Sequence, residues 1–244
     1  MPRILVCMSD NRNLEKSFLD ADYNSLVASI NYEYCKTHKY DFVYYRPYFM
    51  KKDETKLRNC IHPITKNVRH ASWSKLLSTS LALQMEYDYV VYIDSDCIFK
   101  DFSQSLEEFL KPYSDKDILF LNNKPWGDTL PCAGFYICKV NEHTRCFIQD
   151  WYNYNIPEKD TTHAWEQDAL WEIIRLPRKC TIGIIDSWMF RETDQQFLRH
   201  IGSLEGSNRI PYFASFVQSK HIMYEKNIHE IQCIEFDTNP EKGQ

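Results

Sequence analysis

Two carboxylates, Asp94 and Asp96, stand on either side of Ser95 at the end of an apolar run, Tyr89 to Ile93. The run is rich in β-branched and aromatic residues and is apolar on both faces, which is typical of a strand buried in a parallel sheet. If the chain turns at Ser95, both carboxylates converge at the carboxyl end of that strand, where open α/β sheets bind ligands. Carboxylates this close repel each other unless a cation lies between them. The pattern therefore predicts a divalent metal ion that holds a diphosphate, although an ordinary polar turn contains the same residue types.

Other apolar patterns predict the framework that would hold this motif. Short apolar runs predict strands, and apolar residues at helical spacing predict helices between them. The expected strands cover 3–8, 41–45, 89–93, 117–121, 132–138 and 181–185, and the expected helices cover 19–34, 72–85, 106–110, a segment from about 141, and 165–174. Strands that alternate with helices predict an α/β fold with a doubly wound sheet.

Several segments between or at the ends of these elements contain residues suited to a ligand. Ser9 and Asp10 follow the first expected strand, Tyr45 ends the second, and we assign all three to contacts with a nucleotide. Ala133 and Gly134 open a later strand, and small residues let a ligand approach the backbone closely. The polar, basic stretch 47–69 is expected to be a mobile loop beside the site, and 122–131 another loop. From about 186 the pattern is irregular.

Length and charge limit the classes of protein that fit. With 244 residues, of which 43% are apolar, the chain can form one domain over 1–244 with a full core. The net charge is −5 and no run of Lys or Arg stands out, which argues against nucleic acid as a partner.

The cysteines, the amino terminus and the glycines exclude further classes. Nine cysteines form no C-x-x-C pair and are expected to be mostly buried free thiols in a reducing compartment. The apolar run Ile4 to Met8 is too short for a signal peptide or a membrane span, so we expect a soluble, cytoplasmic protein. The six glycines form neither a G-x-G-x-x-G motif nor a P-loop, so a metal ion must hold the phosphates.

Five segments in register resemble the metal-dependent GT-A nucleotide-sugar glycosyltransferases, in particular the galactosyl/xylosyl/mannosyltransferase family typified by fungal and plant Golgi enzymes. The similarity covers about Tyr34 to Leu170. The segments are Tyr34-Cys35-Lys36-Thr37-His38-Lys39-Tyr40, Trp73-Ser74-Lys75-Leu76, Tyr92-Ile93-Asp94-Ser95-Asp96, Ala133-Gly134-Phe135 and Glu166-Gln167-Asp168-Ala169-Leu170. The resemblance implies a GT-A (Rossmann-like) mixed, mainly parallel sheet flanked by helices.

The resemblance also implies roles for individual residues. Asp94 and Asp96 resemble the D-x-D motif, in which the second carboxylate binds Mn²⁺ or Mg²⁺ and the first faces the ribose or the water shell of the metal. Ser95, between them, is assigned to contacts with the nucleotide sugar. Lys75 resembles a lysine that contacts the donor, and Ala133 and Gly134 resemble small residues that line the donor sugar and the acceptor.

A catalytic role is implied for three consecutive residues, Glu166, Gln167 and Asp168. The first two match an acidic residue and a glutamine that lie close to the anomeric carbon in this group and in related retaining enzymes. Positive charge builds on that carbon as the bond to the diphosphate breaks, so a carboxylate or amide oxygen beneath the sugar ring helps. The alternative is a structural role, since acidic residues also stabilise the start of a helix.

A third metal ligand is implied as well, a histidine late in the chain. The stretch 211–220 resembles the segment that carries it, but Ser215 occupies the matching position. His221 lies close by and is the expected replacement. If neither residue contributes, Asp96, water and diphosphate would hold a Mg²⁺ ion.

The sequence therefore predicts a transferase that moves a sugar from a nucleoside diphosphate, with UDP expected, to a glycan or glycoconjugate acceptor. Retention of the anomeric configuration is implied by the resemblance; in an inverting enzyme, Asp168 or Glu166 would be the general base. One alternative is a haloacid-dehalogenase-type phosphatase, whose Asp-x-Asp motif also follows a strand but normally opens the chain. The other is a non-catalytic carbohydrate-binding protein on the same fold.

Overall fold

The computed structural model describes residues 1–50, 56–57, 60–124, 127–187, 189–190, 196–202, 208–225 and 227–236. Its strands are β1 (Ile4–Ser9), β2 (Asp41–Met50), β3 (Lys56–Leu57), β4 (Cys60–Ile61), β5 (Val68–Arg69), β6 (Tyr89–Ile93), β7 (Cys97–Phe99), β8 (Ile118–Asn123), β9 (Gly127–Lys139), β10 (Ile182–Ile185), β11 (Leu198–His200) and β12 (Glu230–Phe236). Its α-helices are α1 (Tyr23–His38), α2 (Ser74–Ala82), α3 (Leu106–Leu110), α4 (Glu142–Tyr152), α5 (Pro157–Thr161), α6 (Trp165–Ile173) and α7 (Arg209–Ser219). Short 3-10 turns cover Phe18–Asp20, Ala71–Trp73 and Lys111–Tyr113.

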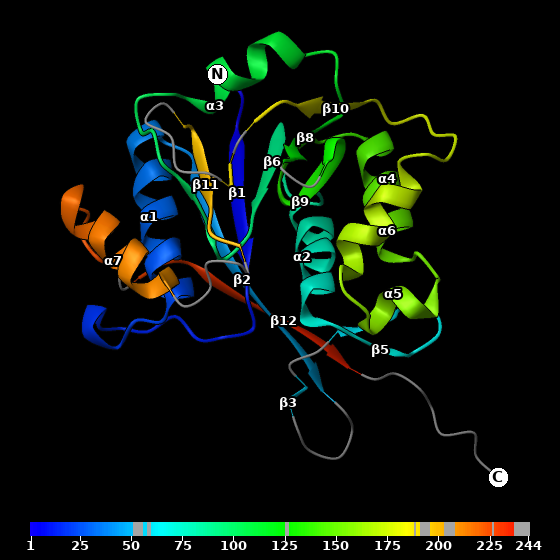
Figure 1. Ribbon diagram of the computed structural model, residues 1–244, viewed down its shortest axis with the longest axis horizontal. Helices are drawn as coiled ribbons and strands as arrows, with labels where there is room; N and C mark the ends of the chain where they lie inside the picture. The colour runs from blue at the N-terminus through cyan, green and yellow to red at the C-terminus, as the bar shows by residue number, and fades with distance from the viewer. Residues whose placement is uncertain are drawn as a thin grey trace.

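A mixed, mainly parallel sheet forms the centre of the described part of the chain (Figure 1). Its strand order is β10-β8-β9-β6-β1-β2-β12, with β3 paired to β2. The pairs β1–β2, β1–β6, β8–β10 and β2–β12 are parallel, whereas β9 runs antiparallel to both β6 and β8. The predicted fold class, a mixed and mainly parallel sheet flanked by helices, is confirmed.

Two layers of helices cover the sheet, with α1 and α7 on one side and α2, α4 and α6 on the other (Figure 1). The side chains of β1, which alternate between the two faces of the sheet, show why both helical layers are needed. Val6 and Met8 pack into the core beneath α1, and Leu5 and Cys7 pack into the core beneath α2. Side chains of successive strand residues point to opposite faces, so a strand that is apolar on both faces requires cover on both.

Polar side chains fix where the helices begin. Asp22 accepts a hydrogen bond from the backbone N–H of Tyr23 at 2.7 Å and caps α1. Asn141 accepts one from the N–H of Thr144 at 2.9 Å and caps α4, and Ser105 forms a capping box with Glu108 at the start of α3. These contacts satisfy backbone donors that have no partner within a helix.

A second, two-stranded sheet pairs β7 with β11 in antiparallel register. His200 lies opposite Cys97, and the N–H of Ile201 donates to the carbonyl of Asp96 at 2.9 Å. This pairing brings a late segment of the chain against the residues that follow β6.

Two stretches differ from their predicted structure. In the expected loop 47–69, β2 continues to Met50, and β4 pairs with β5; residues 51–55 and 58–59 lie outside the described residues. The expected loop 122–131 is largely the register-shifted pairing of β8 with β9. The part from 186, which showed no clear pattern, contains β11, α7 and β12.

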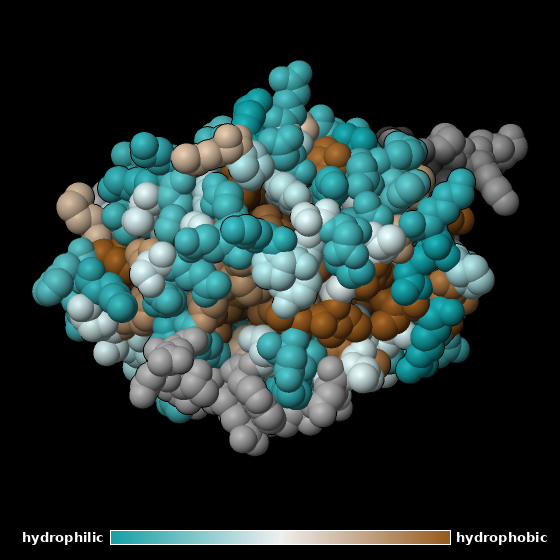
Figure 2. Space-filling model, turned by 90° about the horizontal axis from the view of Figure 1, so that it is seen from above, coloured by the Kyte–Doolittle hydropathy of each residue, from teal (hydrophilic) through white to brown (hydrophobic). Residues whose placement is uncertain are grey.

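Figure 2 views the molecule from the top of Figure 1, the end near which β1 begins. Hydrophilic residues cover most of this face, and apolar residues gather toward its lower right. Because β1 runs away from this end, the carboxyl ends of the parallel strands lie at the opposite one. Among the described residues, no helix has both the length and the apolar character needed to cross a membrane.

Candidate metal and ligand site

The chain turns sharply between β6 and β7, as the sequence predicts. The N–H of Asp94 donates to the carbonyl of Gly134 at 2.9 Å, and the N–H of Cys97 donates to the carbonyl of Asp94 at 3.0 Å. The turn places Asp94, Ser95 and Asp96 at the carboxyl end of β6, beside the start of β7. Both carboxylates therefore reach the same space.

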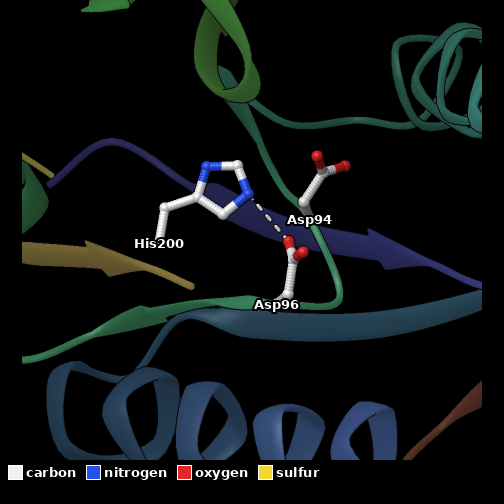
Figure 3. A group of neighbouring side chains, drawn as sticks. All are labelled: Asp94, Asp96 and His200. Atoms are coloured by element: carbon white, nitrogen blue, oxygen red, sulfur yellow. Dashed lines mark hydrogen bonds and ion pairs between the residues drawn. The ribbon is translucent and has the colours of Figure 1, made fainter. Parts of the chain in front are cut away.

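A histidine from β11 completes this group. His200 Nε2 lies 2.8 Å from Asp96 Oδ1, and one potential ligand atom from each of Asp94, Asp96 and His200 lies within 4.8 Å of the other two. Figure 3 shows the three side chains arranged around a common space. Two carboxylates and an imidazole are an accepted donor set for a divalent transition-metal ion.

Gly134 leaves the room that this arrangement needs. A Cβ atom added there would lie 2.6 Å from His200 Cε1 and 3.2 Å from Asp94 Oδ2. Real Cβ atoms essentially never make a contact as short as 2.6 Å, so a larger residue would displace the His200 ring, and the Asp94 carboxylate would have to give slightly. The sequence predicts that a ligand approaches the backbone closely at Gly134. In the structure, the groups that lie close to it are the side chains of His200 and Asp94.

The electrostatics of the three groups differ. Burial raises the pKa of Asp94, and Asp96 adds to the rise while Lys75 opposes it. Burial alone would also raise the pKa of Asp96, but His200 and Arg209 hold it below its ordinary value. Burial acts to lower the pKa of His200, but Asp96 outweighs it and raises the pKa to about 10. A carboxylate and an imidazolium therefore face each other at neutral pH.

Lys75 joins Asp94 to the predicted catalytic segment. Its Nζ lies 2.9 Å from Asp94 Oδ1 and 2.8 Å from Glu166 Oε1, and it donates to the carbonyl of Ala133 at 3.3 Å. Only 4% of Lys75 is exposed. Burial would lower the pKa of Lys75, but the two carboxylates raise it well above its usual range. A permanent buried cation therefore holds Asp94 and Glu166 together.

Glu166 and Gln167 hold different positions in the wall of the site. Glu166 is buried, and its Oε2 has no hydrogen-bond partner in the described part of the chain. Gln167 Oε1 accepts from the N–H of Ala133 at 2.7 Å, and its Nε2 donates to the carbonyl of Pro131 at 2.7 Å. Gln167 thus fixes the backbone of β9, and Glu166 retains a free oxygen.

These residues line a cavity of about 810 Å³. Its wall includes Ser9, Asp10 and Ser95, which the sequence analysis assigned to the nucleotide. Ser95 Oγ donates to Asp10 Oδ2 at 2.7 Å, and Ser9 Oγ lies 3.1 Å from the hydroxyl of Tyr92. The structure therefore brings these predicted contacts together with Lys75, the D-x-D pair, Ala133, Gly134, Glu166 and Gln167.

Three predicted residues do not belong to the described wall of this cavity. Tyr45 is buried in the core beneath α2 and acts through its backbone carbonyl, which accepts from the N–H of Asp10 at 3.1 Å. Asp168 forms an ion pair with Lys159. His221 is exposed just beyond α7, with a left-handed φ of 52°, and is not in the metal-ligand group. The structure therefore does not place His221 with Asp94 and Asp96, as the sequence led us to expect; His200 lies beside them instead.

Sequence reasoning missed His200 and the basic and aromatic side chains around it. Arg209 Nη2 lies 2.7 Å from Asp96 Oδ2. Elsewhere in the cavity lining, the rings of His70 and Trp165 stack with their centroids 3.7 Å apart and their planes 4° apart. Trp165 has a left-handed φ of 51°, a strained conformation for so large a residue that is typical of functional sites. No local pattern singles these residues out, because long-range pairing assembles them.

Compared by sequence, the chain matches no protein-family model and no curated protein. Compared by structure, it is similar to a glycosyltransferase involved in the glycosylation of the major capsid of PBCV-1, with a TM-score of 0.62 and 14% identity over 88% of this chain and 100% of that one. The chain has a GT-A fold.

Two further proteins are less similar in structure to this GT-A chain. A mutant of Drosophila β-1,4-galactosyltransferase 7, solved with manganese, UDP-Gal and xylobiose, has a TM-score of 0.43 and 12% identity over 85% of this chain and 74% of that one. The 4-diphosphocytidyl-2C-methyl-D-erythritol synthase of Anaerococcus prevotii has a TM-score of 0.42 and 10% identity over 89% of this chain and 99% of that one.

Proposed function

We propose that this protein is a metal-dependent glycosyltransferase that moves a sugar from a nucleoside diphosphate, with UDP expected, to a glycan or glycoconjugate acceptor. The observation that carries the proposal is the group of Asp94, Asp96 and His200, which meets at the carboxyl end of β6 in an 810 Å³ cavity. The GT-A fold supports it, because open α/β sheets bind their ligands at this end.

Asp94, Asp96 and His200 are the residues proposed to hold a divalent ion, which would stabilise the negative charge of the departing diphosphate. The imidazole among the donors favours Mn²⁺ over Mg²⁺, since Mg²⁺ prefers oxygen ligands. Lys75 fixes the Asp94 carboxylate from behind through its 2.9 Å ion pair. The three side chains already lie close together, so the ion would mainly replace the partners that Asp96 now holds.

Glu166 is proposed to stabilise the anomeric carbon. Its Oε2 is buried and free, and Lys75 holds the other oxygen at 2.8 Å. A carboxylate fixed in this way suits the positive charge that develops on the sugar, as the proposed retaining reaction requires. Gln167 is a positioning residue, because both ends of its amide hold β9. The stacked rings of His70 and Trp165 offer an apolar surface for a sugar ring.

Neither alternative gains an observation in its favour. The phosphatase motif normally opens the chain, whereas here it follows β6 in a GT-A fold. A non-catalytic carbohydrate-binding protein would suit a chain that lacks a third metal ligand, and His200 supplies a candidate for that ligand.

A donor panel tests the proposal. Wild type, Asp96→Asn and, as a matched control, Asp115→Asn are incubated with UDP- and GDP-sugars, with Mn²⁺ or EDTA, and released nucleoside diphosphate is measured. Asp115 is exposed and pairs with Lys116, outside the described cavity wall. We expect one donor to be hydrolysed only with metal, at a rate that falls at least about a hundredfold in Asp96→Asn and is unchanged in Asp115→Asn. Metal-independent sugar binding without turnover, or phosphate release from a small phosphoester, would contradict the proposal.

A further inference from the structure

Both oxygens of the Asp96 carboxylate already have a partner. Oδ1 lies 2.8 Å from His200 Nε2, and Oδ2 lies 2.7 Å from Arg209 Nη2. The Asp96 and Arg209 side chains are 16% and 17% exposed, so solvent screens this ion pair only partly. A metal ion at Asp96 would compete with these two cationic partners for the carboxylate, both through the oxygen lone pairs and through charge repulsion.

Arg209 is the partner that can leave. His200 belongs to β11 and is itself a candidate ligand, whereas Arg209 is the first residue of α7 and has a long, flexible side chain. A cation at the amino-terminal end of a helix is unfavourable for the helix dipole, so the stability of α7 does not explain an arginine there. The contacts of its side chain explain it better: Nη2 pairs with Asp96, and Nε donates to the carbonyl of Ile201 at 3.0 Å.

Two guanidinium groups, those of Arg209 and Arg12, lie over the same Tyr23 ring. The Arg209 guanidinium lies 4.9 Å from the centroid of the Tyr23 ring, and that of Arg12 lies 4.0 Å from the same centroid. Arg12 is tied to Asp10 at 2.6 Å and to Asp22 at 2.8 Å. Arg209, Arg12 and Tyr23 all line the cavity that contains Asp94 and Asp96. A diphosphate bound there would meet a guanidinium suited to two parallel hydrogen bonds.

We propose that Arg209 is an exchange residue: it neutralises Asp96 while no metal ion is bound, and its guanidinium passes to the diphosphate of the donor when the carboxylate takes up the ion. The exchange balances charge, because Asp96 gains a divalent cation as it loses the guanidinium, and the guanidinium gains an anion. The inference rests on the proposed function in one respect, that the anion is a diphosphate. It also predicts that metal and diphosphate bind cooperatively.

Two titrations test the exchange. Calorimetry measures the binding of Mn²⁺ alone, and then of inorganic pyrophosphate at saturating Mn²⁺, to wild type, Arg209→Met, Arg209→Lys and Arg12→Met. Arg209→Met is expected to bind Mn²⁺ alone about tenfold more tightly, because a charge-assisted competitor is gone. It is expected to bind pyrophosphate about tenfold more weakly, because the same guanidinium is missing from the anion.

Arg12→Met is the matched control, since it removes the same charge from the same cavity without touching Asp96. It should weaken pyrophosphate binding without the tenfold gain for Mn²⁺. Arg209→Lys keeps the charge and should fall between wild type and Arg209→Met in both titrations, which guards against a misfolded variant. The proposal is overturned if Arg209→Met fails to gain affinity for Mn²⁺, if it fails to lose affinity for pyrophosphate, or if Arg12→Met gains as much.

The results also distinguish failure of the proposed glycosyltransferase function from failure of the Arg209 exchange. Both opposite shifts without transfer from any nucleotide sugar would count against the glycosyltransferase and support the exchange. Sugar transfer with unchanged Mn²⁺ affinity in Arg209→Met would support the enzyme and overturn the exchange.

Discussion

His200 and Gly134 set the geometry of the carboxylate pair. His200 Nε2 contacts Asp96 at 2.8 Å, and the missing side chain at Gly134 leaves space for His200 and Asp94. The site therefore depends on His200, which supplies a donor atom, and on Gly134, which has no side chain to fill the space.

Gly134→Ala should weaken Mn²⁺ binding. The new Cβ would lie 2.6 Å from His200 Cε1, so the imidazole must shift away from Asp96, and we expect a loss of about tenfold or more in metal affinity. Gly202→Ala is the control, because its Cβ would lie 3.7 Å from Phe190, an ordinary contact at the same cavity. Equal Mn²⁺ affinities of the two variants in calorimetry would contradict this explanation.

Lys75→Met should destabilise the fold. It leaves the buried Glu166 and the partly exposed Asp94 without their shared cation, and removal of one member of a buried ion pair such as Lys75–Glu166 costs about 3 kcal/mol or more. Urea denaturation measures the free energy of unfolding. The double variant Lys75→Met with Glu166→Gln should recover part of the loss, because one of the two stranded charges is gone. A double variant less stable than Lys75→Met would argue against this charge network.

The turn that follows β4 depends on a neutral histidine, His62. His62 is fully buried after β4; its Nδ1 lies 3.1 Å from the N–H of Ile64 and 3.2 Å from that of Thr65, and its Nε2 lies 3.2 Å from the carbonyl of Tyr154. Nδ1 must accept two hydrogen bonds while Nε2 donates one, which only the neutral ring can do. Burial, with a smaller effect of Arg69, lowers the pKa of His62.

This arrangement predicts a loss of stability in mild acid. Because the pKa of His62 is lower in the folded state, the unfolded chain binds the proton first, and the stabilisation present above the ordinary histidine pKa of about 6.5 is lost as the pH falls below it. Urea denaturation from pH 7.5 to 5.5 measures the slope. His62→Gln should be less stable at pH 7.5 and show a shallower fall; parallel slopes for the two proteins would contradict the assignment.

How far the sequence could predict this structure depends on how local each feature is. The run Tyr89 to Ile93 predicted β6, and the turn at Ser95 followed from the residues beside it. His200 could not be found in this way, because it lies 104 residues from Asp96 and reaches it only through the register of β11 on β7. His221 is favoured only by its place in the sequence, and the end of α7 leaves it exposed. Asp168 likewise shares a helix with Glu166 but forms its ion pair with Lys159.

Across the whole molecule, the sheet joins segments that each supply part of one cavity. The carboxyl ends of β1 and β6 bring Ser9 and Asp94, β9 brings Gly134, β11 brings His200, and α6 brings Glu166. Because these elements meet only in the folded chain, a ligand that bridges them should stabilise the fold as a whole.

Thermal unfolding should report this linkage. A ligand at about 100 times its Kd adds about 2.7 kcal/mol, which for a chain of this size raises Tm by about 5–10 °C. We expect Mn²⁺ together with UDP to produce such a shift in wild type, and EDTA or Asp96→Asn to abolish it. A shift of the same size in UDP with EDTA would contradict metal-dependent binding.

The central claim is that Asp94, Asp96 and His200 hold the metal ion of a nucleotide-sugar site. The most direct measurement is a calorimetric titration of UDP in saturating Mn²⁺ into wild type, His200→Asn and His221→Asn. We predict that His200→Asn loses affinity at least about tenfold and that His221→Asn binds as wild type does. Unchanged affinity in His200→Asn, or a loss confined to His221→Asn, would contradict the site described here.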